Sequence, residues 1–188
     1  MKKSITIAAS AFTALALCIC SCSKDSDTSI AANQEKIIET LVNSLLSSNE
    51  GAYAVYNDGA TRVVFNRGES SDSLAANGSA TLYYAGFTLP SAAISTANLF
   101  VTNYKEFAEA ASWSVSDSTV FQSITLSPSD NGLLSGIRKG LVGVHKGEES
   151  VILFTSRYGF GGKQNGTINA HSALAYHLWV EDIKNDIE

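Results

Sequence analysis

Histidines, carboxylates and a glycine-rich stretch are the parts of this sequence whose residue types could do enzyme chemistry. His145, His171 and His177 lack the spacing of metal ligands, so we expect surface or hydrogen-bonded core histidines. The aspartates and glutamates are dispersed and supply no carboxylate pair for glycoside hydrolysis. The stretch 159–166 (GFGGKQNG) lacks the Lys-Ser/Thr that completes a phosphate-binding loop. We therefore expect no metal site and no cofactor.

The cysteines are the residues best placed for a covalent modification. The stretch Ile19-Cys20-Ser21-Cys22 resembles a lipobox, the motif at which bacterial lipoproteins are cleaved and acylated. Small Ser21 precedes Cys22, whereas bulky Ile19 precedes Cys20. We therefore expect cleavage before Cys22, with lipid on its thiol and its new amino group. Because no cysteine follows Cys22, the mature chain has no disulfide.

The N-terminus that precedes this motif has the pattern of a secretory signal. Lys2 and Lys3 are followed by a largely apolar run, 5–19, that is short for a membrane span. We predict a signal peptide over 1–21 and a protein of the cell envelope, outside the cytoplasm and anchored by lipid to the outer membrane. An uncleaved N-terminal anchor is the alternative, and it gives the same side of the membrane.

Composition favours a packed fold and argues against a nucleic-acid partner. Hydrophobic residues make up 45% of the chain and prolines number two, which is unlike a disordered protein. The net charge of −5 offers no sign of the basic face that nucleic-acid binding needs.

Two segments separate the lipidation motif from the main domain. Residues 22–30 are polar and predict a flexible tether. Residues 31–50 predict an amphipathic helix that Gly51 ends, because apolar side chains recur at three- and four-residue spacing: Ile37, Ile38, Leu41, Val42, Leu45 and Leu46. A single apolar stripe must pack on something; we favour this domain itself over a dimerisation partner.

Residues 51–188 predict one domain of α+β class. The Asn57-Asp58-Gly59 turn between two short strands indicates a hairpin. Strands are predicted over 52–56, 62–65, 81–87, 120–126, 151–154 and 174–180, with helices over 104–111 and, for about three turns, 133–144. Because strands outnumber helices and do not alternate with them, we expect an antiparallel sheet with a central helix on one face.

The C-terminal third resembles the corresponding part of FKBP-type peptidyl-prolyl isomerases. In that family a Val-Ile-x-Gly-Trp segment opens the central helix; a Gly-Glu turn, an apolar strand, a Tyr-x-Tyr-Gly loop and a last strand follow. The matching segments here are 133–137 (LLSGI), 147–148 (GE), 151–154 (VILF), 158–161 (YGFG) and 174–183 (LAYHLWVEDI). Upstream, 83–86 (YYAG) is similar to a Tyr-x-Gly strand, and Phe100 lies near the position of a Phe-Asp pair. The resemblance implies an antiparallel sheet wrapped around a short central helix.

The resemblance also implies a cleft that binds proline. Prolyl isomerisation needs no nucleophile, only a site that binds the twisted amide better than either planar isomer. The implied catalytic residues are Tyr84, Phe100, Leu134, Phe160 and Tyr176, with the Leu134 backbone N–H donating to the substrate carbonyl. The implied substrate-binding residues are Leu133, Ile137, Ile168 and Phe121, where Gln122 is an alternative to Phe121.

Several family side chains are replaced in this sequence. Ile137 stands where the family has its tryptophan, Val101 where it has the aspartate, and Phe160 where it has the second loop tyrosine. The prolines after Ile168 are replaced by the pair 169–170 (NA). These changes remove polar contacts and a flat ring but leave the cleft apolar. We therefore expect substrate binding to be retained more readily than the acceleration of isomerisation.

Three functions follow. The first is a lipid-anchored prolyl isomerase that assists the folding of exported proteins, whose proline-containing segments would be its partners. The second is an FKBP-like binding module that has lost catalysis. The third is a structural envelope lipoprotein that assembles through its N-terminal helix.

Overall fold

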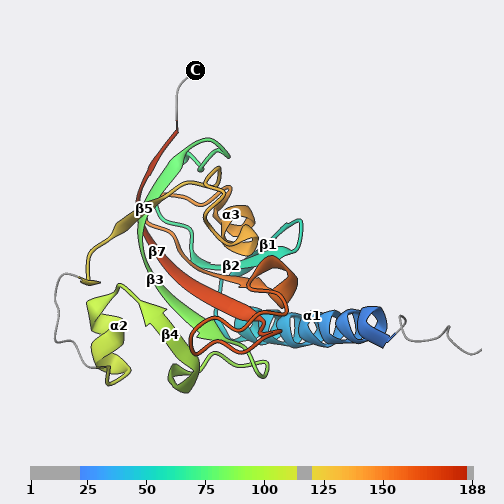
Figure 1. The fold of residues 1–188 in the computed structure, drawn as a ribbon. Helices are drawn as coiled ribbons and strands as arrows, with labels where there is room; N and C mark the ends of the chain where they lie inside the picture. Colours follow the sequence, from blue (N-terminus) through green and yellow to red (C-terminus); the bar gives the residue numbers. More distant parts are fainter. Residues whose placement is uncertain (1–21, 114–119, 186–188) are drawn as a thin grey trace, which may run out of the picture.

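Seven antiparallel strands form one twisted sheet in the computed structural model, which describes residues 22–113 and 120–185 (Figure 1). The strand order is β1-β2-β6-β7-β3-β4, and β5 pairs with β3 beside β4. Their bounds are β1 Tyr53–Asn57, β2 Ala60–Asn66, β3 Ser79–Thr88, β4 Leu99–Thr102, β5 Ile124–Leu126, β6 Glu149–Phe154 and β7 Leu174–Lys184. The predicted antiparallel α+β architecture is confirmed. The predicted signal peptide, 1–21, lies outside the described residues.

The predicted hairpin joins β1 to β2. Asn57 pairs with Ala60, so the turn has two residues. Both residues have positive φ, 43° at Asp58 and 96° at Gly59. A two-residue turn of this kind matches the right-handed twist of the strands it joins, and Asp-Gly tolerates its backbone angles.

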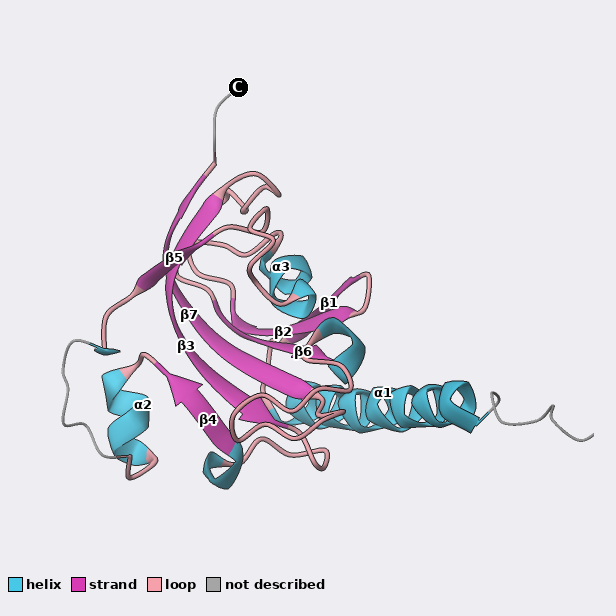
Figure 2. Ribbon diagram, viewed as in Figure 1, coloured by secondary structure: helices cyan, strands magenta, loops and turns pink. Residues whose placement is uncertain are grey.

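The sheet has apolar side chains on both faces, and each face is covered by a helix (Figure 2). Alternation along β7 assigns Leu174, Tyr176 and Leu178 to the face beneath α3 (Ser135–Leu141), as predicted. Ala175 faces the opposite side, where α1 (Cys22–Ser48) packs. A short helix, α2 (Lys105–Ala110), lies beside β4 in the segment that leads to β5.

Helix α1 packs on this chain's own sheet, which confirms the packing we favoured. Ile38, Leu41 and Val42 are buried in the apolar cluster of the outer face. The helix begins at Cys22. Residues 22–30, which we predicted as a flexible tether, therefore have helical backbone and form its first turns. No glycine or proline occurs between residues 22 and 50 to interrupt a helix that packing already holds. Within 22–113 and 120–185, no helix has both the length and the apolar character that crossing a membrane requires.

Three elements differ most from the prediction. The strand predicted over 120–126 is β5, which begins only at Ile124. Just before it, the Gln122 carbonyl accepts a hydrogen bond from the Asn103 side chain instead of a strand partner. Strand β4 was not predicted, since it has four residues and lies between loop-like segments. Helix α3 has seven residues instead of about three turns. It stops before Gly143, whose φ of 81° leaves the helical region.

A buried arginine terminates α3. Arg62, on β2, is 3% exposed, and its Nη1 donates to the Gly140 and Val142 carbonyls at 2.5 and 2.8 Å. Its Nη2 donates to the Gly143 carbonyl at 2.9 Å. The Gly140 and Val142 carbonyls are among the groups that a helix end leaves without intrahelical partners, and the Gly143 carbonyl directly follows them. A cation at this end is also favoured by the helix dipole.

The charge of Arg62 is balanced by the fully buried Glu148. Arg62 Nε lies 3.1 Å from Glu148 Oε1, and Glu148 Oε2 accepts from the His145 backbone N–H. Burial lowers the pKa of the Arg62 guanidinium, and the Glu148 carboxylate opposes that change. The pair thereby ties β2, the end of α3 and the turn before β6 to one another.

We expect Arg62→Met to lower the free energy of unfolding by about 3–5 kcal/mol, because Glu148 stays buried without its partner. Lys105→Ala is the control: it removes the exposed Lys105–Glu109 pair and changes stability by less than about 0.5 kcal/mol. Urea unfolding measures both. Equal effects of the two substitutions would contradict a structural role for the buried pair.

Candidate functional site

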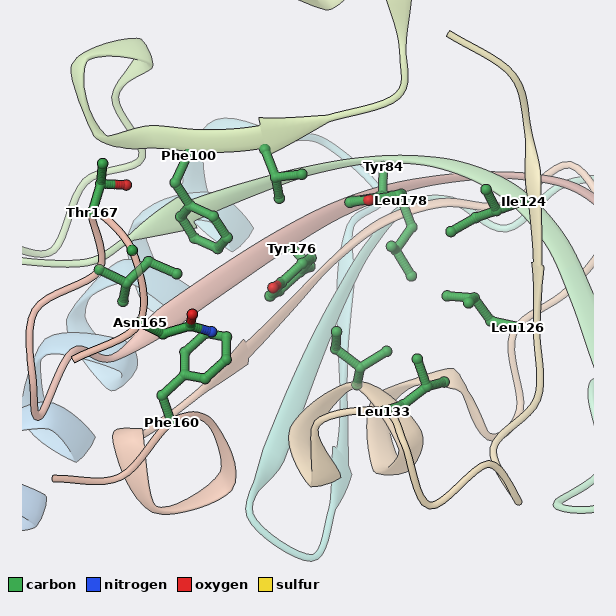
Figure 3. A pocket seen from close by; sticks show the side chains of 14 residues that line it. Tyr84, Phe100, Ile124, Leu126, Leu133, Phe160, Asn165, Thr167, Tyr176 and Leu178 are labelled. Atoms are coloured by element: carbon green, nitrogen blue, oxygen red, sulfur yellow. The ribbon is translucent and has the colours of Figure 1, made fainter. Parts of the chain in front are cut away.

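A cleft of about 400 Å³ opens on the α3 side of the sheet (Figure 3). Strands β3, β4, β5 and β7, the start of α3 and the segment between β6 and β7 contribute its walls. No lining residue has a charged side chain. The lining residues are Tyr84, Phe100, Val101, Ile124, Leu126, Leu133, Ile137, Phe160, Asn165, Gly166, Thr167, Ile168, Tyr176 and Leu178.

Tyr176 forms the centre of an aromatic cluster at this cleft. It is 7% exposed, and its ring stacks on that of Phe154 with centroids 6.0 Å apart and planes 9° apart. The edge of Phe100 meets it at 5.8 Å, and Tyr84 lies at 6.2 Å. Phe160 faces the group from the other side of the cleft (Figure 3). Such edge and offset contacts hold flat rings in fixed positions.

Gly86 allows these rings to come together. A Cβ at this position on β3 would lie 2.8–3.0 Å from atoms of Val101, Phe100 and Tyr176. Any larger residue would therefore push β4 away from the cluster.

Two glycines bring α3 down onto the sheet. Gly136 and Gly140 are four residues apart and so share one face of the helix. A Cβ at Gly136 would lie 2.2 Å from the Phe154 ring, and one at Gly140 would lie 2.3 Å from Ile152. The close packing of α3 on β6 brings Ile137 into the cleft lining.

The remaining wall belongs to the segment 156–171, which we call the wall loop. It contributes Phe160 and residues 165–168 to the lining. The Gly161 N–H donates to the Ser156 carbonyl and the Gly161 carbonyl accepts from the His171 N–H, both at 2.8 Å. Asn165 and Ile168 exchange two backbone hydrogen bonds at 2.9 Å. These bonds give the loop a defined shape without a helix or strand over most of its length.

The cleft offers neutral polar groups. Burial raises the pKa of Tyr84 and of Tyr176 above the ordinary value of 10.0, and Tyr84 adds to the rise at Tyr176. Both hydroxyls therefore keep their protons at neutral pH. In the described part of the chain, no group of three or more His, Cys, Asp or Glu side chains could hold a metal ion.

Most of the predicted site residues meet in this cleft. Those that line it are Tyr84, Phe100, Leu133, Ile137, Phe160, Ile168 and Tyr176. Leu134 does not line it: it is the N-cap residue of α3 and packs against the same apolar cluster. The role predicted for its backbone N–H stays a prediction.

The placement of Phe121 or Gln122 in the cleft is wrong. Both residues precede β5 and lie outside the lining, whereas Ile124 and Leu126 line it. Ile124 and Leu126 were not predicted as lining residues, because the sequence does not give the register in which this strand pairs with β3. Alternation of Ile124 and Leu126 around Thr125, which pairs with Thr81, is the signal that could have placed it. Residues 165–167 and Leu178 were also missed as lining.

Comparison with solved structures finds FKBP-domain proteins. FkpA from Escherichia coli aligns over 86% of this chain and 64% of its own, with a TM-score of 0.55 and 14% identity. The three FKBP domains of wheat FKBP73 align over 72% and 50%, at 0.55 and 11%. The N-terminal domain of FKBP42 from Arabidopsis thaliana aligns over 71% and 93%, at 0.51 and 15%.

These matches show that the chain has an FKBP-like fold, as predicted. It spans half of the wheat structure and under two thirds of FkpA. No protein-family model matches the sequence. A search of curated proteins finds no match either.

The buried tyrosines predict an alkaline loss of stability. Because the folded state holds the Tyr176 proton more tightly than the unfolded state, the free energy of unfolding falls as pH rises above about 10. Tyr176→Phe should reduce that fall, measured by urea unfolding at neutral pH and near pH 10.5. Tyr56→Phe, at a 72% exposed residue, is the control and should leave the fall unchanged. The same fall in Tyr176→Phe as in the original chain would refute the assignment.

Proposed function

We propose that this chain is a peptidyl-prolyl cis-trans isomerase that assists the folding of exported proteins. The observation that carries the proposal is the uncharged cleft in which Tyr84, Phe100, Phe160 and Tyr176 surround an apolar space. Proline is an apolar ring, and an aromatic enclosure of this kind accepts it while excluding water. Proline-containing segments of unfolded polypeptides are the substrates that fit.

The chemistry asked of the cleft is modest. The barrier to rotation, about 18–20 kcal/mol, comes from the loss of amide resonance as the C–N bond twists. A cleft without charge favours the twisted amide, because the twisted form has lost the charge separation that water stabilises in the planar form. The backbone N–H of Leu134 and the neutral hydroxyls of Tyr84 and Tyr176 are the donors we assign to the substrate carbonyls.

A binding module without catalysis is the second candidate. Val101 and Ile137 both line the cleft, and neither offers a hydrogen bond to a twisting amide. Affinity for an apolar segment depends on the enclosure, whereas rate depends on contacts made only in the transition state. A cleft with these two residues can therefore bind a proline-containing segment without accelerating its isomerisation.

Assembly through the N-terminal helix, the third candidate, has less support. The apolar stripe of α1 packs largely against this chain's own sheet, where Ile38, Leu41 and Val42 are buried. A second copy would find little apolar surface on this helix.

An isomerisation assay on the chain from Ser23 tests the first candidate. With a short peptide carrying an apolar residue before proline, we expect acceleration that Phe160→Ala and Tyr176→Ala lower at least about tenfold, because each removes a ring from the cleft. Tyr56→Ala, at an exposed tyrosine on β1, should keep full activity. Far-ultraviolet circular dichroism checks that each variant is folded.

The outcome separates the two leading candidates. The binding module would be favoured over the isomerase if the folded chain binds the peptide in calorimetry but does not accelerate its isomerisation.

We propose that the protein acts outside the cytoplasm, held to the outer membrane by lipid on Cys22. The lipobox-like motif around Cys22 and the apolar run before it support this location. Expression in a bacterium with labelled palmitate should label the chain, Cys20→Ser should keep the label, and Cys22→Ser should lose it together with sedimentation in the membrane fraction. Label that is lost in Cys20→Ser and kept in Cys22→Ser would overturn this assignment.

A further inference from the structure

Gln34 is a buried polar side chain on a helix that otherwise packs through apolar residues. It is 5% exposed and lies one turn before Ile38 on α1. Its Oε1 accepts from the Ser156 N–H at 2.8 Å and from the Ser156 hydroxyl at 3.0 Å. Its Nε2 donates to the His171 carbonyl. One side-chain amide thus uses both its acceptor and its donor on this contact.

The two partners of Gln34 are the first and last residues of the wall loop. The same two residues are also bridged by the backbone N–H and carbonyl of Gly161. Gln34 therefore holds the two ends of the wall loop together from the α1 side, and Gly161 holds them together from inside the loop. Phe160 and residues 165–168, which line the cleft, lie between the two closed ends.

The bond to His171 also supports a backbone conformation that side chains rarely adopt. His171 has a φ of 57°, in the left-handed region. Such a conformation at a residue other than glycine costs about 1–2 kcal/mol and persists where surrounding contacts determine it. A donor fixed on a packed helix is such a contact.

We propose that Gln34 is a positioning residue for the cleft: α1 sets the place of the wall loop through this one amide. The inference rests on the proposed function for its kinetic part. It goes beyond that function because it makes the N-terminal helix, outside the cleft, a determinant of substrate binding. Gln34 lies outside the cleft lining and acts through Phe160 and its neighbours.

Gln34→Leu tests the proposal, because leucine fills similar space without the hydrogen bonds. We expect amide hydrogen exchange in residues 159–170 to quicken at least tenfold and KM for the proline peptide to rise about five- to tenfold, with kcat within twofold. A displaced wall weakens ground state and transition state alike, which raises KM alone. Ser156→Ala removes only the hydroxyl contact, keeps the N–H, and should change KM less than twofold.

Leu41→Ala is the matched control on the same helix. Leu41 is 3% exposed against the outer face of the sheet, so its truncation lowers stability without touching the wall loop. Loss of folded molecules lowers the apparent kcat and leaves KM unchanged. Leu41→Ala should therefore spare both KM and the exchange of residues 159–170 relative to the rest of the chain.

Unchanged exchange in Gln34→Leu, or a rise in KM that Leu41→Ala reproduces, would overturn the proposal. Should the original chain show no isomerisation, the proposed function fails, and hydrogen exchange alone decides whether Gln34 holds the wall loop.

Discussion

The cleft depends on one buried cation. Arg62 reaches from β2 to the carbonyls that end α3, and the carboxylate of Glu148 neutralises it. This contact fixes the end of the helix over the sheet, while the glycine face of α3 determines how near the helix comes. The aromatic side chains of β3 and β7 enclose a space because α3 is held in this position over the sheet.

A cleft built in this way depends on shape more than on charge. The polar side chains of its lining are hydroxyls and one amide, and burial raises the pKa of its two tyrosines. Val101 and Ile137 add apolar surface to the lining and need no hydrogen-bond partner there.

Local patterns predicted much of this structure, and long-range register accounts for most of what they missed. The alternation in 174–180 and the Asn57-Asp58-Gly59 turn are local signals, so both elements were predicted correctly. The wall formed by Ile124 was not, because its place depends on pairing with β3 some forty residues earlier in the chain. Arg62 and Gln34 carry no local sign of burial: their roles appear only when carbonyls distant in sequence are brought beside them.

The helical start of α1 has a mechanical consequence. Twelve residue steps lead from Cys22 to Gln34, whose side chain is hydrogen-bonded to Ser156. At 1.5 Å per residue they extend about 18 Å, and as a helix they act as a stiff arm rather than a slack cord. If Cys22 carries the proposed lipid, the arm would hold the start of the fold within about 18 Å of the anchor. A substrate would then be met close to the membrane surface.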